Sequence, residues 1–154
     1  MMKATGIVRR IDDLGRIVIP KEIRRTLHIR ESDPLEIFTD REGQVILKKY
    51  SPIGEMTTFA KQYAESLAQV SGHATLIADR DQFIAVSGGC KQLLNKAVSR
   101  QLEERINNRE TVIAAKGDRN YVNIAEDIAV DYAWQLITPI ICEGDIIGSV
   151  ILLE

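Results

Sequence analysis

Cysteine and histidine are scarce in this chain. Its 154 residues include two cysteines, Cys90 and Cys142, and two histidines, His28 and His73. Two thiols cannot build a disulfide framework, and these four side chains do not have the sequence spacing of a closed metal site. The sequence therefore predicts neither a disulfide-stabilised fold nor a bound metal, and no motif in it indicates a cofactor.

Long apolar runs are also absent. No segment approaches the roughly 20 apolar residues that a membrane-spanning helix needs. The start MMKATGIVRR lacks the apolar core of a signal peptide. We therefore expect a cytoplasmic protein that does not contact a membrane. The hydrophobic content of 45% and the charged content of 27% are ordinary for a globular protein.

Charge is distributed unevenly along the chain, which has a formal net charge of −2. Residues 1–50 carry eleven lysines and arginines against eight acidic residues, whereas residues 51–154 carry nine against fourteen. Because a residue before proline disfavours the helical conformation, Ser51 and Pro52 mark a break in the chain. We expect a domain boundary near Tyr50, with a basic part before it and an acidic part after it.

The basic part begins with a pattern of short strands and one helix. Residues 6–8 and 16–19 are rich in β-branched side chains and flank the turn formers at 12–15, which predicts a strand, a turn and a strand. Pro20 suits the first position of a helix, and residues 21–29 predict a helix of about two turns.

A second pair of strands is predicted at residues 35–39 and 44–47, joined by a short turn at 40–43. A unit of about 50 residues with one short helix buries too little surface to be stable alone. Residues 17–19 and 45–47 are apolar on both faces of their strands, so each strand needs two covered faces. We therefore expect an obligate dimer.

Arginines are concentrated at the ends of the first two predicted strands and on the predicted helix: Arg9, Arg10, Arg16, Arg24 and Arg25. The guanidinium group offers a fixed fork of donors that suits phosphates and guanine edges. Neutralising phosphates releases counterions, which supplies affinity for any DNA sequence. With only one short helix here, a helix-turn-helix is excluded, and DNA contacts would use strands and loops.

Other charged residues lie close to these arginines. Lys21 and Arg30 would add to the positive field of the basic part. Asp12 and Asp13 lie in the turn between the arginines, where we expect them to pair with arginine and shape the loop. A role as paired catalytic carboxylates is the less favoured interpretation.

Residues 3–50, from KATGIVRR through DLGRIVIPKEIRRTL to PLEIFTDREGQVILKKY, resemble the AbrB-type swapped-hairpin domain of bacterial transition-state regulators. The resemblance implies an interleaved β-frame formed by residues 1–50 of two chains, hence a homodimer, and a transcriptional regulator of the transition-state or sporulation type. It also implies that the arginines of GIVRR, LGR and EIRR contact double-stranded DNA. In this sequence they are Arg9, Arg10, Arg16, Arg24 and Arg25.

The acidic part opens with a predicted connecting helix, residues 51–72. Apolar residues recur along it at spacings of three and four, and Gly72 ends it. They are Ile53, Met56, Phe59, Tyr63, Leu67 and Val70. This stripe could pack on the chain's own sheet or against a partner chain, and the pattern leaves both options open.

Residues 73–154 mix predicted antiparallel strands with helices, so we expect the α+β class. The expected strands are 74–78, 83–86, 111–114, 135–142 and 146–153, and helix formers gather at 91–97 and 99–108.

The closing pattern of a proline-bearing strand, a Gly-Asp turn and IIGSVILL resembles the last hairpin of GAF domains. The resemblance implies a GAF-like sensor domain with an unidentified small-molecule ligand. Sporulation members of the AbrB-type family continue into a further helix that helps to pair these domains. Because the sequence stops at Glu154, we expect an incomplete sensor domain, and a tetramer stays an option beside the dimer.

Two other functions remain as alternatives. Some GAF domains reduce oxidised methionine with cysteines, and Cys90 follows a flexible Ser-Gly-Gly segment. Cys142, however, ends an apolar run where a buried, inert thiol is expected, so we do not expect an enzyme. Related swapped-hairpin domains also occur in antitoxins with short, disordered extensions. The regular patterns in residues 74–153 favour a sensor instead.

Overall fold

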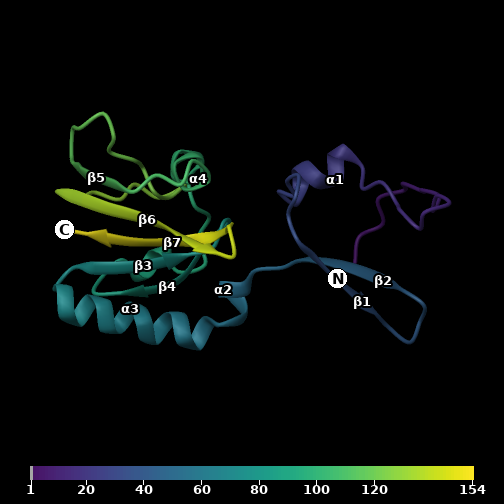
Figure 1. Cartoon of the computed structure of the whole chain (residues 1–154), viewed down its shortest axis with the longest axis horizontal. Helices are drawn as coiled ribbons and strands as arrows, with labels where there is room; N and C mark the ends of the chain where they lie inside the picture. The colour runs from purple at the N-terminus through teal and green to yellow at the C-terminus, as the bar shows by residue number, and fades with distance from the viewer. Residues whose placement is uncertain (1) are drawn as a thin grey trace. The chain divides into compact units, whose positions relative to one another are not determined.

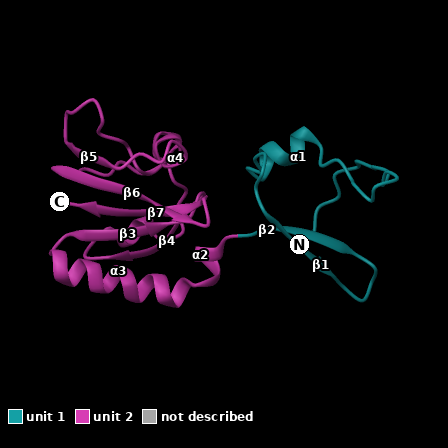
Figure 2. Cartoon of the chain, in the orientation of Figure 1, with its two compact units in different colours: residues 1–50 teal, residues 51–154 magenta. Residues whose placement is uncertain are grey.

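The computed structural model describes residues 2–154, and the chain divides into two compact units (Figure 2). The N-terminal unit ends at Tyr50 and the C-terminal unit begins at Ser51. Figure 1 labels the helices and strands of both. The basic and the acidic parts of the chain are therefore separate structural units, each with its own helices and strands.

The N-terminal unit contains one short helix and one β-hairpin. Helix α1 (Lys21–Thr26) follows Pro20, whose fixed φ suits the start of a helix. Strands β1 (Leu35–Thr39) and β2 (Val45–Lys49) pair antiparallel along their whole length. The hairpin predicted for this segment is present.

Helix α1 ends earlier than predicted. The sequence suggested a helix over residues 21–29, but His28 has a positive φ of 53°. The Ile29 amide donates to the Arg24 carbonyl (2.8 Å) and the His28 amide donates to the Arg25 carbonyl (3.3 Å). This pair of hydrogen bonds is the Schellman arrangement, which ends a helix at a left-handed residue.

Residues 6–8 and 16–19 do not form strands in the single chain, and this part of the prediction was wrong. The turn between them is closed by hydrogen bonds from the Asp12 amide to the Arg16 carbonyl (3.0 Å) and from the Gly15 amide to the Asp12 carbonyl (3.1 Å). Beyond this turn, neither segment has a paired strand within the described residues. A strand without a neighbour leaves its backbone groups unpaired. The β-branched pattern is present, but one chain supplies no partner strand.

The C-terminal unit is built on a five-stranded antiparallel sheet in the order β4-β3-β7-β6-β5. Its strands are β3 (Ala74–Ala78), β4 (Phe83–Ser87), β5 (Val112–Ala115), β6 (Trp134–Cys142) and β7 (Asp145–Leu153). Every strand predicted for this unit occurs close to its expected bounds. With the helices that pack on it, the sheet confirms the α+β class.

Both faces of the sheet are covered (Figure 1). Helix α3 (Thr57–Ser71) lies on one face and packs on β3 and β4. The 3-10 helix η1 (Lys91–Leu93), helix α4 (Arg100–Asn107) and the loop at residues 116–133 contribute to a larger apolar cluster on the other face. The C-terminal unit therefore has two buried cores, one on each side of its sheet.

The connecting helix is divided, and its apolar stripe lies mostly outside the core. Helix α2 (Pro52–Glu55) ends at Met56, after which α3 begins. The α3 residues buried against the sheet are Ala60 and Ala64, because small side chains allow a close approach of helix to sheet. Four larger residues of the stripe are exposed: Met56, Phe59, Tyr63 and Val70.

The start of the C-terminal unit is fastened to the turn between β3 and β4. The Ser51 hydroxyl accepts a hydrogen bond from the Gly54 amide (3.0 Å) and donates one to the Asp79 carboxylate (2.9 Å). The other oxygen of that carboxylate accepts from the amides of Asp81 and Gln82, both at 2.8 Å. One buried aspartate thus holds the first helical turn of this unit against its sheet.

Candidate nucleic-acid interface

The first turn of the chain holds Arg16 through Asp12. One oxygen of the Asp12 carboxylate accepts hydrogen bonds from the amides of Leu14 (2.9 Å) and Arg16 (2.8 Å). The other oxygen accepts from Nε of the Arg16 guanidinium (2.8 Å). Gly15 has a φ of +74°, which residues with a side chain rarely adopt. The turn therefore fixes both the backbone and the side chain of Arg16.

The contact with Arg16 also changes the acidity of Asp12. Hydrogen bonds from the backbone and then from the side chain of Arg16 lower the pKa of Asp12. The carboxylate is therefore ionised at neutral pH, and its pairing with arginine agrees with the role predicted for it. Asp13 makes no comparable contact within residues 2–154.

The same turn occurs a second time with no arginine after its glycine. The sequences DDLGR and DREGQ share an aspartate and, three residues later, a glycine. In the second turn, Asp40 accepts hydrogen bonds from the amides of Glu42 and Gln44, both at 2.9 Å, and Gly43 has a φ of +81°. The residue after the glycine is Gln44 here and Arg16 in the first turn. Sequence analysis missed this correspondence, although the shared Asp-x-x-Gly spacing could have revealed it.

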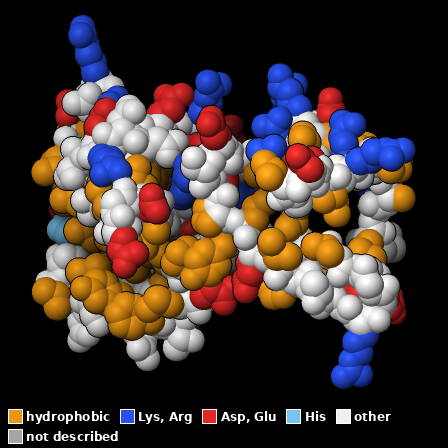
Figure 3. Space-filling view, turned by 45° about the vertical axis from the view of Figure 1, so that its right-hand side comes forward, with side chains coloured by type: hydrophobic (Ala, Val, Ile, Leu, Met, Phe, Trp, Pro, Cys, Tyr) orange, Lys and Arg blue, Asp and Glu red, His pale blue; other side chains and the backbone are white. Residues whose placement is uncertain are grey.

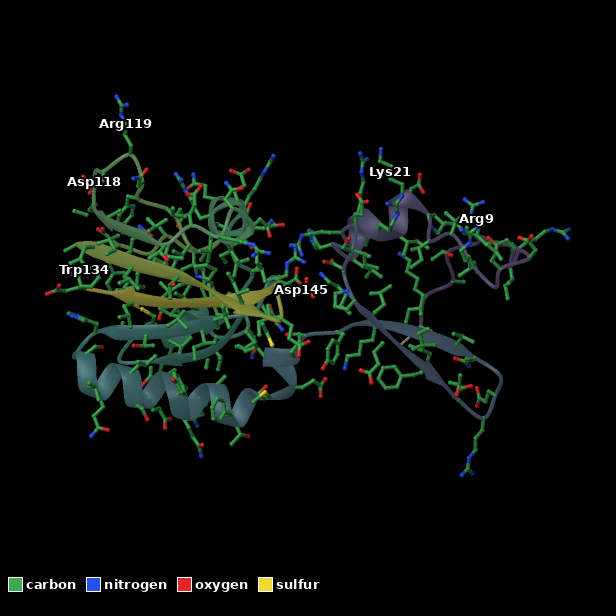
Figure 4. The ribbon with its side chains drawn as sticks, in the orientation of Figure 1. Arg9, Lys21, Asp118, Arg119, Trp134 and Asp145 are labelled. Carbon is green, nitrogen blue, oxygen red and sulfur yellow. The ribbon has the colours of Figure 1, made fainter. Side chains whose placement is uncertain are left out.

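Two further arginines of the predicted set lie on α1. Arg24 donates from Nε to the carbonyl of Ile19 (3.1 Å), so its side chain turns back over the segment that precedes the helix. Arg25 is exposed and makes no side-chain hydrogen bond or ion pair in the described part of the chain. Lys21, at the start of the helix, projects outward (Figure 4). Of these cationic groups, only Arg24 is tied to the backbone.

Arg9 and Arg10 precede the first turn and are exposed. Neither has an ionic or hydrogen-bonding partner for its side chain among residues 2–154. Figure 4 shows Arg9 at the surface of the N-terminal unit. The five arginines thus fall into two groups, in which Arg16 and Arg24 are held by neighbouring groups whereas Arg9, Arg10 and Arg25 are not.

Arg30 and Lys49 have a structural role in the same unit. Both lie 3.9 Å from one carboxylate oxygen of Asp33, whose side chain is only 4% exposed. That oxygen also accepts from the Arg30 amide (2.8 Å), and Nζ of Lys49 donates to the His28 carbonyl (2.8 Å). Asp33, which sequence analysis missed, therefore joins the segment that follows α1 to β2. The charge of Arg30 is partly compensated, so it adds less to the surface field than expected.

Apolar side chains share the surface of the N-terminal unit with these cations. Among residues 2–50 only Pro20 is buried. Hydrophobic side chains are visible beside lysines and arginines in the space-filling view (Figure 3). The most exposed are Met2, Val8, Ile11, Leu14, Val18, Ile37 and Val45. Apolar surface of this extent on a folded unit marks an interaction site.

The two cysteines have different environments. Cys90 is buried beside the hydroxyl of Tyr132, and burial raises the pKa of its thiol. Cys142 is exposed, so the prediction that it is a buried, inert thiol was wrong. It is the last residue of β6 and pairs with Asp145, which is labelled in Figure 4. This end of the hairpin lies beyond the part that the apolar clusters cover.

The cysteines also lie at opposite ends of the sheet. Cys90 follows Gly89, and a Cβ added at Gly89 would lie 3.8 Å from Cβ of Ala74. Ala74 pairs with Leu153, the last residue of β7, so Cys90 lies near that end of the strand. Cys142 pairs with the first residue of β7. The nine residues of that strand span about 26 Å at roughly 3.3 Å per step. Two thiols so far apart cannot form a redox disulfide.

Neither a membrane helix nor a metal cluster is present in the described part of the chain. None of the helices in residues 2–154 is long and apolar enough to cross a membrane. The same residues contain no group of three or more histidine, cysteine, aspartate or glutamate side chains that could hold a metal ion.

Known proteins similar to this chain are regulators of transcription. A family model described as stage V sporulation protein T C-terminal, transcription factor, matches residues 55–154. The chain is 56% identical to stage V sporulation protein T of Bacillus subtilis (strain 168) over 152 residues, which are 98% of this chain and 84% of that protein. The chain belongs to the stage V sporulation protein T family. It is therefore a transcriptional regulator of the transition-state and sporulation type, and the expectation that it is not an enzyme agrees with these relatives.

The N-terminal part of this family member is similar to AbrB. The chain is 44% identical to transition state regulatory protein AbrB of Bacillus subtilis (strain 168) over 108 residues, which are 70% of this chain and 93% of that protein. The solution structure of the N-terminal DNA recognition domain of Bacillus subtilis AbrB is 63% identical over 33% of this chain and 94% of that chain, with a TM-score of 0.29. The predicted resemblance to the AbrB-type family is confirmed.

A second family model matches a shorter part of the chain. It is described as antidote-toxin recognition MazE, bacterial antitoxin, and covers residues 8–55. The match includes most of the N-terminal unit and a few residues of the connecting segment, and it leaves the sheet of the C-terminal unit outside.

Proposed function

We propose that this regulator binds double-stranded DNA as a homodimer through residues 1–50. The arginines that make the contacts are Arg9, Arg10, Arg16, Arg24 and Arg25. The proposal rests on one observation above all: only Pro20 is buried among residues 2–50, while apolar side chains and unpaired arginines are exposed on the same unit. The DNA recognition domain of AbrB, 63% identical to part of this chain, supports the choice of DNA.

Dimer formation would complete the fold of the N-terminal unit. Residues 6–8 and 16–19 have the side-chain pattern of strands but no neighbouring strand among the described residues of their own chain. If two chains interleave their hairpins, each supplies the missing strand of the other, and apolar residues such as Val8 and Val18 become buried. An interleaved, swapped-hairpin β-frame is the arrangement that satisfies both requirements.

A dimer would also gather the positive charge. Two copies bring ten of these arginines to one surface, and each phosphate that they neutralise releases condensed counterions. The acidic balance of residues 51–154 would disfavour contact of that part with DNA. DNA binding is therefore assigned to the N-terminal unit alone.

Within the C-terminal unit, residues 73–154 are proposed to be a GAF-like sensor that follows the connecting segment 51–72 and adjusts the geometry of the DNA-binding dimer in response to an unidentified small molecule. The closing β6–β7 hairpin and the central position of these strands in the sheet support this comparison. Helix α3 presents an exposed apolar stripe that includes Phe59 and Tyr63, whose ring centroids lie 5.6 Å apart. Contact between two such stripes would join dimers into a tetramer.

A salt titration tests DNA binding most simply. Arg25→Ala should flatten the dependence of log K on log salt by roughly 0.9 for each phosphate that the variant no longer neutralises, because fewer counterions are released. Lys61→Ala is the matched control, since Lys61 is an exposed cation on α3 of the other unit. Equal affinities and slopes for the wild type and both variants would contradict the proposal.

An antitoxin function is the second candidate, favoured by the MazE match over residues 8–55. In that case the chain would bind and neutralise a toxin protein through a segment after the N-terminal unit. The folded C-terminal unit favours a sensor. A toxin gene next to the gene for this chain, and rescue of cells from that toxin by residues 51–154, would favour the antitoxin.

A further inference from the structure

Arg16 differs from the other arginines of the predicted set in being held by a carboxylate. Its Nε donates to Asp12 at 2.8 Å, and the same aspartate fixes the Arg16 backbone through the amide at 2.8 Å. Arg24 is held only by a backbone carbonyl, and Arg9, Arg10 and Arg25 have no side-chain partner in the described residues. The chain therefore orients one arginine with a negative charge and leaves three unrestrained.

We propose that Asp12 is a positioning residue that aims Arg16 at the edge of a base, so that Arg16 determines sequence preference. On this assignment Arg9, Arg10 and Arg25 neutralise phosphates. The inference rests on the proposed DNA binding of residues 1–50 and goes beyond it by giving the arginines different tasks.

The physical reason lies in what each contact requires. Attraction between an arginine and phosphates depends mainly on charge, and a neighbouring carboxylate would weaken it by repelling the phosphate. Recognition of guanine requires two parallel hydrogen bonds to O6 and N7, so the guanidinium plane must be oriented. When Asp12 occupies Nε of Arg16, both terminal nitrogens stay available for such a pair.

The second turn of the unit, which Asp40 closes, has no arginine after its glycine for the carboxylate to orient. Asp40 closes its turn with the same two amide contacts, but the residue after its glycine is Gln44, whose side chain donates to Glu42 (3.1 Å). The exposed Arg41 lies earlier in this turn, and no arginine occupies the position that corresponds to Arg16. The shared geometry makes the second turn an internal control. Removal of the Asp40 carboxylate changes a turn, whereas removal of the Asp12 carboxylate changes a turn and an arginine.

The test uses Asp12→Asn and Asp40→Asn in the full-length chain. Asparagine keeps the oxygen that accepts the two backbone amides, and it replaces the oxygen that faces Nε of Arg16 with an amide donor. Circular dichroism and thermal unfolding check that each variant is folded. The probe is a pool of DNA duplexes with about 20 randomised base pairs, roughly two helical turns, enriched by the wild type and sequenced, with one unrelated mixed-sequence duplex for comparison.

We expect Asp12→Asn to reduce the preference for the enriched duplex over the mixed-sequence duplex by about tenfold, because one well-oriented base contact supplies discrimination of that order. Affinity for the mixed-sequence duplex should hold or rise, since a negative charge is removed. Asp40→Asn should keep the wild-type preference. In an Arg16→Ala background, Asp12→Asn should cause no further reduction of the preference.

Four results would overturn the inference while DNA binding itself stands. They are an unchanged preference in Asp12→Asn or in Arg16→Ala, an equal reduction in Asp40→Asn, and a further reduction from Asp12→Asn when Arg16 is already absent. If the wild type binds neither the pool nor the mixed-sequence duplex, the proposed function fails and the inference with it.

Discussion

The two units of this chain differ most in how they bury their apolar residues. The C-terminal unit packs apolar clusters on both faces of a five-stranded sheet, and side chains such as Phe83 and Leu76 are fully buried. The N-terminal unit has comparable β-branched residues, but in its described part only Pro20 is buried. The C-terminal unit therefore has a buried core of its own, whereas the described part of the N-terminal unit does not.

This difference arises because the described part of the N-terminal unit lacks partner strands for some of its apolar segments. The pattern of β-branched residues at 16–19 resembles that of strands in the C-terminal unit, which have partners inside the chain. An exposed apolar strand gains stability only when another strand pairs with it and covers it. On the proposed function, the unit that carries the arginines is the one that needs a second chain, and DNA binding would depend on association of two chains.

A charge placed on the proposed dimer face should have the largest effect. Val18 and Ile113 are equally exposed in one chain, at 70% and 71%, but only Val18 lies in the N-terminal unit. We expect Val18→Glu to weaken dimerisation and DNA binding by roughly a hundredfold, because it would place an unpaired charge in an interface. Sedimentation velocity and fluorescence anisotropy with labelled DNA measure the two effects.

Ile113→Glu is the matched control and should leave both properties unchanged. If both variants dimerise and bind DNA equally well, Val18 has no special role in dimerisation, and the proposed difference between the two units is contradicted.

Damage to the core of the C-terminal unit should have a different result. Phe83 is fully buried, so Phe83→Ala is expected to lower the free energy of unfolding of this unit by about 3–5 kcal/mol. Trp134 is the only tryptophan of the chain and belongs to β6, so its fluorescence during urea unfolding reports on this unit alone. DNA binding by the N-terminal unit should persist without urea. A decline of DNA binding in proportion to the decline of stability would show that the units are not independent.

A smaller effect is expected where β7 approaches β3. A Cβ added at Gly148 would overlap the Ala78 carbonyl oxygen and would lie 2.7 Å from Cδ1 of Ile53. Gly148→Ala should therefore lower the free energy of unfolding by about 1–3 kcal/mol, because neighbouring strands must move apart. The urea midpoint of Trp134 fluorescence measures this, and an unchanged midpoint would contradict the close approach.

The smallest effect concerns alkaline pH. Burial, together with the neighbouring Cys90, raises the pKa of Tyr132 to about 12 from its ordinary value of 10.0. Because the folded chain holds this proton more tightly than the unfolded chain, the stabilising contribution is complete below pH 10.0 and is lost as the pH rises towards 12. Absorbance of tyrosinate should show one late step that Tyr132→Phe removes. Persistence of that step in the variant would assign it to another tyrosine.

The sequence predicted the C-terminal sheet well because this unit contains all of its own strand partners. Alternating and apolar runs at 74–78 and 135–142 report on burial that one chain can provide. The same reasoning failed at residues 6–8 and 16–19, where the pattern indicates strands but the described residues supply no neighbour for them. Periodicity shows that a face is apolar without showing what covers it.

Side-chain size explains another difference between prediction and structure. The stripe on α3 was identified by its large residues, yet Ala60 and Ala64 pack on the sheet and Phe59 and Tyr63 are exposed. Cys142 was misjudged for a related reason, since an apolar run can extend past the end of the covered hairpin. The assignment of the five arginines to DNA stays a prediction. A sequence shows which arginines are present and where they lie along the chain, whereas the hydrogen bond from Arg16 to Asp12 is visible only in the structure.

Amide hydrogen exchange of residues 16–19 in the full-length chain tests the central claim most directly. If two chains complete one β-frame, these amides should be protected at concentrations where the chain is dimeric, and protection should fall on dilution and in Val18→Glu. If the amides exchange at the rate of an unfolded segment while the chain still binds DNA, the arginine-bearing unit works without a partner and the account is contradicted.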